Sequence, residues 1–270
     1  MVSSVSNNYG NYYYDGNNVY TRQDHDKARA GVILAGVATA AIAKLLPSFS
    51  NPFFKQVAKE HANNHLYKDA FMQSINNSGL KEKGLNFVNL TSSEKYKDIA
   101  AGFNACYMPG SKSIMLNAEK ATISGFHELG HAMNHLKSKT GKLLQKCRKP
   151  GYAIVGLMGW MALNVRNKPK GAERNFEEVI EDNAGKIAFC AMLPTVIEEA
   201  MASYKGVKLA KEVGLAEPLV KNLKKLYGKA LLSYLGYATI SGLSVFVASK
   251  IMETFTRPKK VEPQDWHNTY

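Results

Sequence analysis

One short stretch decides the fold of this chain: Phe126-His127-Glu128-Leu129-Gly130-His131, which matches the pattern H-E-x-x-H. Residues four apart in a helix are separated by about 400° of rotation, so His127 and His131 project from one face a single turn apart. Both can therefore bind one tetrahedral metal ion. Glu128 is offset by about 100°, which keeps it from coordinating but lets it contact a metal-bound water. The motif predicts a zinc site with two histidine ligands and Glu128 as the general base of amide hydrolysis.

A catalytic zinc ion needs a third protein ligand. Metzincins carry a histidine ten residues after the first, but here that position is Lys137, which excludes that class. Glu199 is the better candidate, because it is followed by residues small enough for a close helix approach: Ala200, Ala202 and Ser203. Its neighbour Glu198 should point about 100° away, to pack elsewhere or face solvent. The rival third ligand is Glu181, which lies in an acidic, polar stretch.

Other metal-capable side chains carry weaker signals. His135 continues the four-residue spacing, but each step drifts by about 40° around the helix, so it is either a neighbour of the ligands or a surface residue. His61 and His65, with Asp69 a turn later, lack a catalytic glutamate and should lie on the surface. The cysteines form no CxxC pair and are interpreted as buried or idle thiols: Cys106, Cys147 and Cys190.

The segments around the motif predict a fold that is mainly α with a small β-sheet, a zincin-like metallopeptidase core with apolar helices. The motif helix should run from Asn117 to Leu136 and be capped by Asn117. A further helix is expected from Pro52 to Asn76, and short strands at Leu85–Leu90 and Ile114–Leu116. Ser113–Leu116 should form an exposed edge near the metal, where an extended substrate adds as a strand.

Four apolar segments point to an integral, multi-pass membrane protein: 28–48, 151–165, 187–197 and 231–249. Only 231–249 is uncharged for long enough to span a bilayer, and the shorter runs also fit buried core helices. Segment 28–48 is a candidate membrane anchor behind a flexible polar tail at 1–27. The metallopeptidase domain is assigned to 52–270. Lys and Arg flank the apolar runs on both sides, so the positive-inside rule gives no orientation.

The composition fits this interpretation. An apolar content of 45% allows a buried core, and the net charge of +13 favours an anionic partner. A lipid bilayer is the favoured partner besides a polypeptide substrate. Nucleic acid is less favoured, although the basic charge does not exclude it.

In order and spacing, the region from Gly102 to Ile251 resembles gluzincin-type membrane zinc peptidases of the YugP type and, more distantly, HtpX. The resemblance is carried by Ser113–Leu116, by His127-Glu128-Leu129-Gly130-His131-Ala132, by Glu199 with Ala202-Ser203, and by the closing apolar helix. It implies Zn²⁺ held by His127, His131 and Glu199, with Glu128 as the base. Ser203 stands where HtpX has an aspartate, so this chain has no aspartate at that position to orient a ligand.

The sequence thus favours a zinc-dependent, membrane-associated endopeptidase. One alternative is a soluble peptidase similar to ImmA/IrrE or SprT, and the resemblance to ImmA/IrrE implies Glu181 as the third ligand. Another is a metal-stabilised membrane scaffold without turnover. The intact Glu128 argues against a scaffold, because a structural zinc site has no need of a base.

Overall fold

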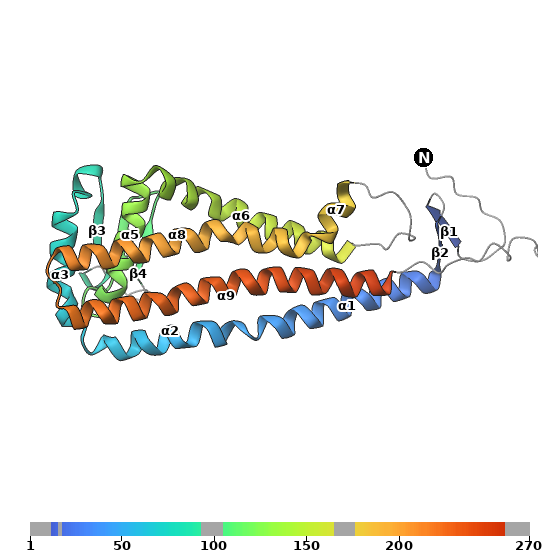
Figure 1. Cartoon of the computed structure of the whole chain (residues 1–270), viewed down its shortest axis with the longest axis horizontal. Coiled ribbons are helices and arrows are strands. Elements are labelled where there is room, and N and C mark those ends of the chain that lie inside the picture. The colour runs from blue at the N-terminus through green and yellow to red at the C-terminus, as the bar shows by residue number, and fades with distance from the viewer. Residues whose placement is uncertain (1–11, 16–17, 93–104, 165–175, 257–270) are drawn as a thin grey trace, which may run out of the picture. The chain divides into compact units, whose positions relative to one another are not determined.

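The computed structural model describes residues 12–15, 18–92, 105–164 and 176–256, and these are mainly helical (Figure 1). The α-helices are α1 (Arg22–Ala43), α2 (Leu46–His61), α3 (Asn64–Asn77), α5 (Thr122–Lys137), α6 (Lys139–Asn164), α7 (Phe176–Asp182), α8 (Ala184–Glu212) and α9 (Glu217–Phe255). The strands are β1 (Tyr12–Asp15), β2 (Asn18–Thr21), β3 (Asn86–Asn89), β4 (Ala105–Met108) and β5 (Ser113–Leu116). The expected fold class, mainly α with a small β-sheet, is confirmed.

The chain divides into two compact units. The first comprises Met1–Ala43, Val155–Ala188 and Ser241–Tyr270, and the second comprises Lys44–Ile154 and Phe189–Ile240. The helices α6, α8 and α9 each contribute residues to both. All residues of the H-E-x-x-H motif, together with Glu198 and Glu199, belong to the second unit.

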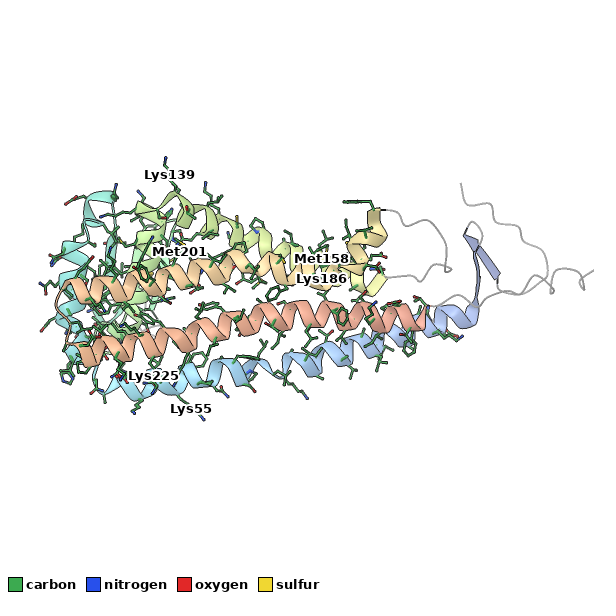
Figure 2. The ribbon with its side chains drawn as sticks, viewed as in Figure 1. Lys55, Lys139, Met158, Lys186, Met201 and Lys225 are labelled. Carbon is green, nitrogen blue, oxygen red and sulfur yellow. The ribbon has the colours of Figure 1, made fainter. Side chains whose placement is uncertain are left out.

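The first unit is held together by small apolar side chains. Its core consists of Ala35, Met158, Ala162, Ala184, Ala188, Val245 and Ala248, and Met158 is labelled in Figure 2. Two glycines permit close helix packing: a Cβ on Gly31 would lie 2.9 Å from the Phe255 Cβ, and one on Gly185 would lie 2.8 Å from the Gly242 carbonyl oxygen. Strands β1 and β2 pair antiparallel, within the segment predicted as a polar tail.

The sheet of the second unit has the order β3-β5-β4, with β3 parallel and β4 antiparallel to β5. Strand β5, the predicted substrate-binding edge, is therefore central, and that prediction was wrong. Ile114 and Leu116 are fully buried, so this strand forms part of the core. Among the described strands, β4 lies at an edge of the sheet. Its side chains alternate in exposure: Cys106 is exposed and Tyr107 is half-buried.

The motif helix α5 packs on α3 and the sheet. The rings of Phe71 and Phe126 meet edge to face with centroids 5.5 Å apart, and both are fully buried. A Cβ on Gly125 would lie 2.7 Å from Leu116 Cδ2, so this glycine lets the helix approach β5. The helix predicted for Pro52–Asn76 is in fact two, because the chain breaks at Ala62–Asn63 between α2 and α3.

The start of α5 is fixed from outside the helix. Asn117 does not cap it as predicted; its Oδ1 accepts the Glu119 N–H at 3.0 Å in a local turn, and α5 begins at Thr122. Asn64 of α3 supplies the cap instead, since its Oδ1 accepts the Thr122 N–H at 2.9 Å. Asn64 also donates to the Ala118 carbonyl at 3.0 Å. This tie sets the position of the two histidines relative to α3.

Among the described residues, three helical spans are long and apolar enough to cross a membrane by length and composition: Asp26–Val57, Ala184–Glu212 and Glu217–Phe255. The second and third extend well beyond the predicted runs 187–197 and 231–249. Helix α6 covers 151–164 of the run predicted for 151–165, whose last residue lies outside the described part of the chain, and α6 is not among these spans.

Candidate metal centre

Close packing of α5 on α8 brings the site together. A Cβ on Gly130 of α5 would collide with the Ala202 carbonyl of α8, and one on Gly206 of α8 would collide with the Phe126 carbonyl of α5. Two glycines therefore let the helix backbones meet without an intervening side chain. As a result, Glu198 and Glu199, about one turn before Ala202 on α8, lie beside the histidines of α5.

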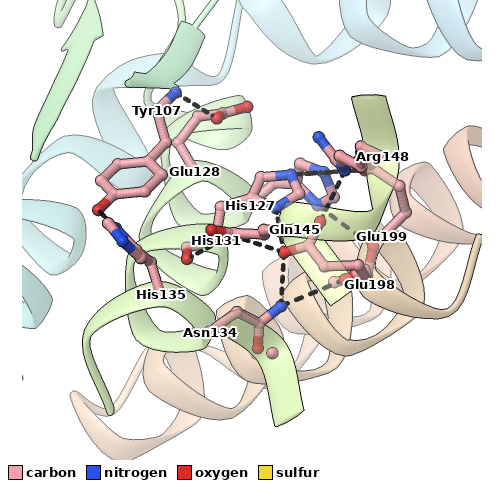
Figure 3. Close-up of polar contacts among 12 residues, drawn as sticks. Tyr107, His127, Glu128, His131, Asn134, His135, Gln145, Arg148, Glu198 and Glu199 are labelled. Carbon is pink, nitrogen blue, oxygen red and sulfur yellow. Dashed lines mark hydrogen bonds and ion pairs between the residues drawn. The ribbon is translucent and has the colours of Figure 1, made fainter. Parts of the chain in front are cut away.

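Three donor atoms form a compact triangle at this junction (Figure 3). His127 Nε2 lies 2.9 Å from Glu199 Oε2 and 3.1 Å from His131 Nε2, and His131 Nε2 lies 3.4 Å from the same Glu199 oxygen. A tetrahedral zinc ion with bonds of 2.0–2.1 Å separates its ligand atoms by about 3.3–3.4 Å. The longest side of the triangle has this spacing and the other two are about 0.2–0.5 Å shorter, so small side-chain movements would let the three atoms share one metal ion.

Glu128 lies next to this triangle. One of its carboxylate oxygens is within 4.8 Å of a ring nitrogen of each histidine. The Tyr107 N–H of β4 donates to Glu128 Oε2 at 2.6 Å, so the sheet holds the carboxylate (Figure 3). Burial raises the pKa of Glu128, and the nearby charge of Glu199 adds to that rise against the lowering effect of the histidines. A raised pKa suits a group that takes up and returns a proton.

Glu198 was predicted to point away from the site, and that prediction was wrong. Its side chain is completely buried, and its Oε1 lies 2.9 Å from His131 Nδ1. The same oxygen accepts from Asn134 at 2.9 Å and from Gln145 at 2.8 Å. A carboxylate beside Nδ1 keeps a proton on that nitrogen. The lone pair of Nε2, one corner of the triangle, is then free to bind a metal.

His127 has a corresponding partner on its own Nδ1. Ser203 Oγ lies 3.2 Å from that nitrogen, and the ring of Tyr227 lies against the imidazole with centroids 5.3 Å apart. Ser203, which stands where the HtpX pattern has an aspartate, thus contacts the imidazole of His127 on the nitrogen that faces away from the triangle. Each histidine has one nitrogen held by α8 and the other turned to the triangle.

The charges of the site favour a bound cation. Three carboxylates gather there, from Glu128, Glu198 and Glu199. Arg148 of α6 pairs with two of them, with Nη2 2.6 Å from Glu198 Oε2 and a contact to Glu199 Oε1. Burial disfavours a charged His131, but its hydrogen bonds with Glu198 and Glu199 prevail and raise its pKa to about 10. The carboxylates therefore favour positive charge beside them, here as a proton on His131.

The remaining candidates lie elsewhere or have other partners. His135 is half-buried and its Nδ1 lies 2.7 Å from the Tyr107 hydroxyl, so it ties α5 to β4. Among the described residues, the groups able to hold a metal are His127–Glu128–His131 and His131–Glu198–Glu199, which do not include Glu181 of α7. His61 is the last residue of α2 whereas His65 belongs to α3, so the two are not on one helix.

Sequence reasoning missed four residues of the site: Tyr107, Asn134, Gln145 and Arg148. Gln145 and Arg148 share a face of α6 at a spacing of three, but nothing in that spacing indicates a metal site. Their contacts depend on how α6 packs on α5 and α8. Gln145 also donates to the His131 carbonyl at 3.0 Å, which ties α6 to the motif helix.

The described residues thus contain a buried His/Glu cluster that could hold a metal ion. Comparison of the chain with models of protein families, with curated proteins and with solved structures finds no match.

Proposed function

We propose that the chain is a zinc-dependent endopeptidase that works at a membrane. The observation that carries the proposal is the triangle of His127 Nε2, His131 Nε2 and Glu199 Oε2, with sides of 2.9, 3.1 and 3.4 Å. The partners on the Nδ1 atoms of both histidines support it, because catalytic zinc sites orient their imidazoles in this way. Three protein ligands with a glutamate beside them are typical of a catalytic rather than a structural site.

Each residue of the site has a separate role in the proposed reaction. Zinc held by the triangle would lower the pKa of a bound water to about 7 and polarise the scissile carbonyl. Glu128 accepts a proton and returns it to the leaving amine, and the Tyr107 N–H fixes its carboxylate. Glu198 and Ser203 orient the imidazoles. Arg148 compensates the charge of the two α8 glutamates.

Strand β4 is the element best placed to hold a substrate. It lies at the edge of the described sheet, and its Tyr107 N–H already contacts the Glu128 carboxylate. An extended polypeptide that pairs with β4 would pass directly beside the proposed base. The substrate class we propose is therefore an unfolded or extended polypeptide segment.

Membrane association rests on the apolar surface of the long helices. Large apolar side chains are exposed along α1 and α9, including Val32, Ile33, Leu34, Val37, Leu232, Leu235, Leu243 and Phe246. Soluble proteins rarely expose so many apolar side chains together, whereas lipid accepts them. The three helical spans long enough to cross a bilayer include both helices.

The test is zinc-dependent cleavage of an unfolded fluorescent polypeptide by the detergent-purified full chain. Wild type should cleave it, lose activity with a zinc chelator and regain it with added zinc. Glu128→Gln should retain one zinc per chain and cleave at least about a hundredfold more slowly, because it lacks the base. Glu119→Gln, an exposed glutamate near the start of α5, is the matched control and should cleave at the wild-type rate. Equal rates for wild type and Glu128→Gln would refute a peptidase.

A further inference from the structure

A groove of about 450 Å³ lies between α8 and α9, next to the proposed metal site but without any of its ligands in the lining. One wall is a single face of α8 and the other a single face of α9. The lining residues are Ser203, Tyr204, Val207, Lys208, Lys211, Lys224, Tyr227, Gly228 and Leu231. The proposed mechanism makes no use of this space.

The groove carries positive charge at one end and apolar surface at the other. Lys208 and Lys211 lie in the last turns of α8, and Lys224 lies in the second turn of α9. None of the described lining residues is acidic. Val207 and Leu231 are apolar, and Leu231 is the second residue of the uncharged stretch of α9 that follows Lys229. An occupant must therefore combine an anionic group with a hydrocarbon portion.

The surroundings strengthen this charge pattern. Residues 205–229 contain seven lysines and two glutamates, a net charge of +5. Both glutamates make only loose ion pairs, Lys208 to Glu212 at 3.7 Å and Lys224 to Glu217 at 3.9 Å, and all four side chains are at least half exposed. Such exposed pairs contribute little and leave the lysines able to turn to another anion.

The two walls also belong to candidate membrane spans, Ala184–Glu212 and Glu217–Phe255, at the ends joined by a short turn. In a bilayer, lysines at the ends of a span extend to the headgroup level, and tyrosines gather there too. From Tyr204 to Lys211 the helix rises by about 10 Å, which is enough to cross the polar headgroup layer of about 5–8 Å on one side of a bilayer. Tyr204 is 72% exposed beside this surface.

We infer that the groove between α8 and α9 binds an anionic phospholipid, with its phosphate among Lys208, Lys211 and Lys224 and an acyl chain along Val207 and Leu231. The bound lipid would also touch the surroundings of the metal centre. Ser203 and Tyr227 line the groove and contact His127, at 3.2 Å and at 5.3 Å between ring centroids. The inference rests on the membrane association proposed above, but not on catalysis.

The test measures lipid binding to the full-length Glu128→Gln chain in zwitterionic detergent, so that cleavage plays no part. A fluorescent phosphatidylglycerol is titrated and competed with unlabelled phosphatidylglycerol, phosphatidylcholine, glycerol phosphate and a polyglutamate peptide. Phosphatidylglycerol should compete at least tenfold better than each of the other three. Equal competition by phosphatidylcholine would overturn the inference, as would displacement by the peptide or by glycerol phosphate, which would identify an acidic polypeptide or a free phosphate as the occupant.

A matched pair of variants locates the site. Lys211→Gln with Lys224→Gln removes one charge from each wall, and at roughly fivefold per lysine should weaken binding by roughly 25-fold. The control, Lys221→Gln with Lys225→Gln, removes the same charge from exposed positions of α9 outside the lining (Lys225 is labelled in Figure 2). It should weaken binding less than threefold.

Equal effects in both variants would show a diffuse basic surface and overturn the inference. A chain that stays in solution without detergent would instead refute membrane association, which separates the two failures. Loss of peptidase activity would leave this binding result unchanged.

Discussion

Replacing Glu198 by glutamine tests the organisation of the site most sharply. Glutamine keeps the length of the side chain and can place its carbonyl oxygen where Oε1 accepts from His131, Asn134 and Gln145. It removes the carboxylate charge that lies beside His131. It also turns the amide NH₂ group toward Arg148, whose Nη2 lies 2.6 Å from Glu198 Oε2 in the wild-type chain. The fold should therefore persist while the imidazole becomes a poorer zinc ligand.

The expected magnitude follows from these contacts. Loss of a carboxylate partner of a metal-bound histidine lowers metal affinity by about 10–100-fold, or about 1.4–2.7 kcal/mol. Glu198→Ala should be worse for a different reason, since it removes the charged acceptor of three hydrogen bonds, from His131, Asn134 and Gln145, at about 1.5–3 kcal/mol each. The glutamine variant isolates the effect on zinc from the effect on folding.

The assay is a zinc titration against a chromophoric chelator with the detergent-purified chain at fixed pH. Glu212→Gln, an exposed glutamate on the same helix, is the control and should bind zinc as wild type does. Unchanged zinc affinity in Glu198→Gln would refute the orienting role. Complete loss of zinc would show that Glu198 is itself a ligand, as the second metal-capable group, His131–Glu198–Glu199, allows.

Further predictions follow from single contacts. Ser203→Ala removes the 3.2 Å partner of His127 Nδ1 and should lower zinc affinity by about tenfold in the same titration, and a wild-type value would exclude Ser203 from the site. Gly130→Ala places a methyl group against the Ala202 carbonyl, so α5 and α8 must separate. This variant should lose about 3 kcal/mol of unfolding free energy and its zinc, whereas Gly156→Ala, which meets nothing within 4 Å, should keep its zinc. The pKa of His135 is lowered by burial and by nearby lysines, so the folded chain binds this proton less readily than the unfolded chain. Stability should therefore fall as the pH drops below about 6.5, and His135→Gln should reduce that fall in denaturant titrations.

The sequence could predict what depends on local periodicity. The shared face of His127 and His131 follows from helical spacing alone, and the small residues after Glu199 indicated a close helix approach. Glu198 was misplaced because a 100° offset describes one isolated helix, whereas both α5 and α6 pack against α8 and bury neighbouring faces. A side chain rotated away from one partner can thus meet another.

Long-range pairing accounts for the other errors. The cap of α5 comes from Asn64, 58 residues before Thr122, and no spacing rule connects the two. The order of the sheet likewise depends on β3 pairing parallel with β5, so the strand nearest the motif in sequence became the central one. Tyr107 then reached Glu128 from β4 instead.

X-ray absorption at the zinc edge of the detergent-purified chain tests the central claim most directly, because it counts the atoms bound to the metal. Wild type should show one zinc per chain with two imidazoles and two oxygens, one from Glu199 and one from water, at about 2.0–2.2 Å. Glu199→Ala should lose the zinc, while Glu181→Ala should give the wild-type spectrum. Sulfur among the ligands, or an unchanged spectrum in Glu199→Ala, would contradict the proposed metal centre.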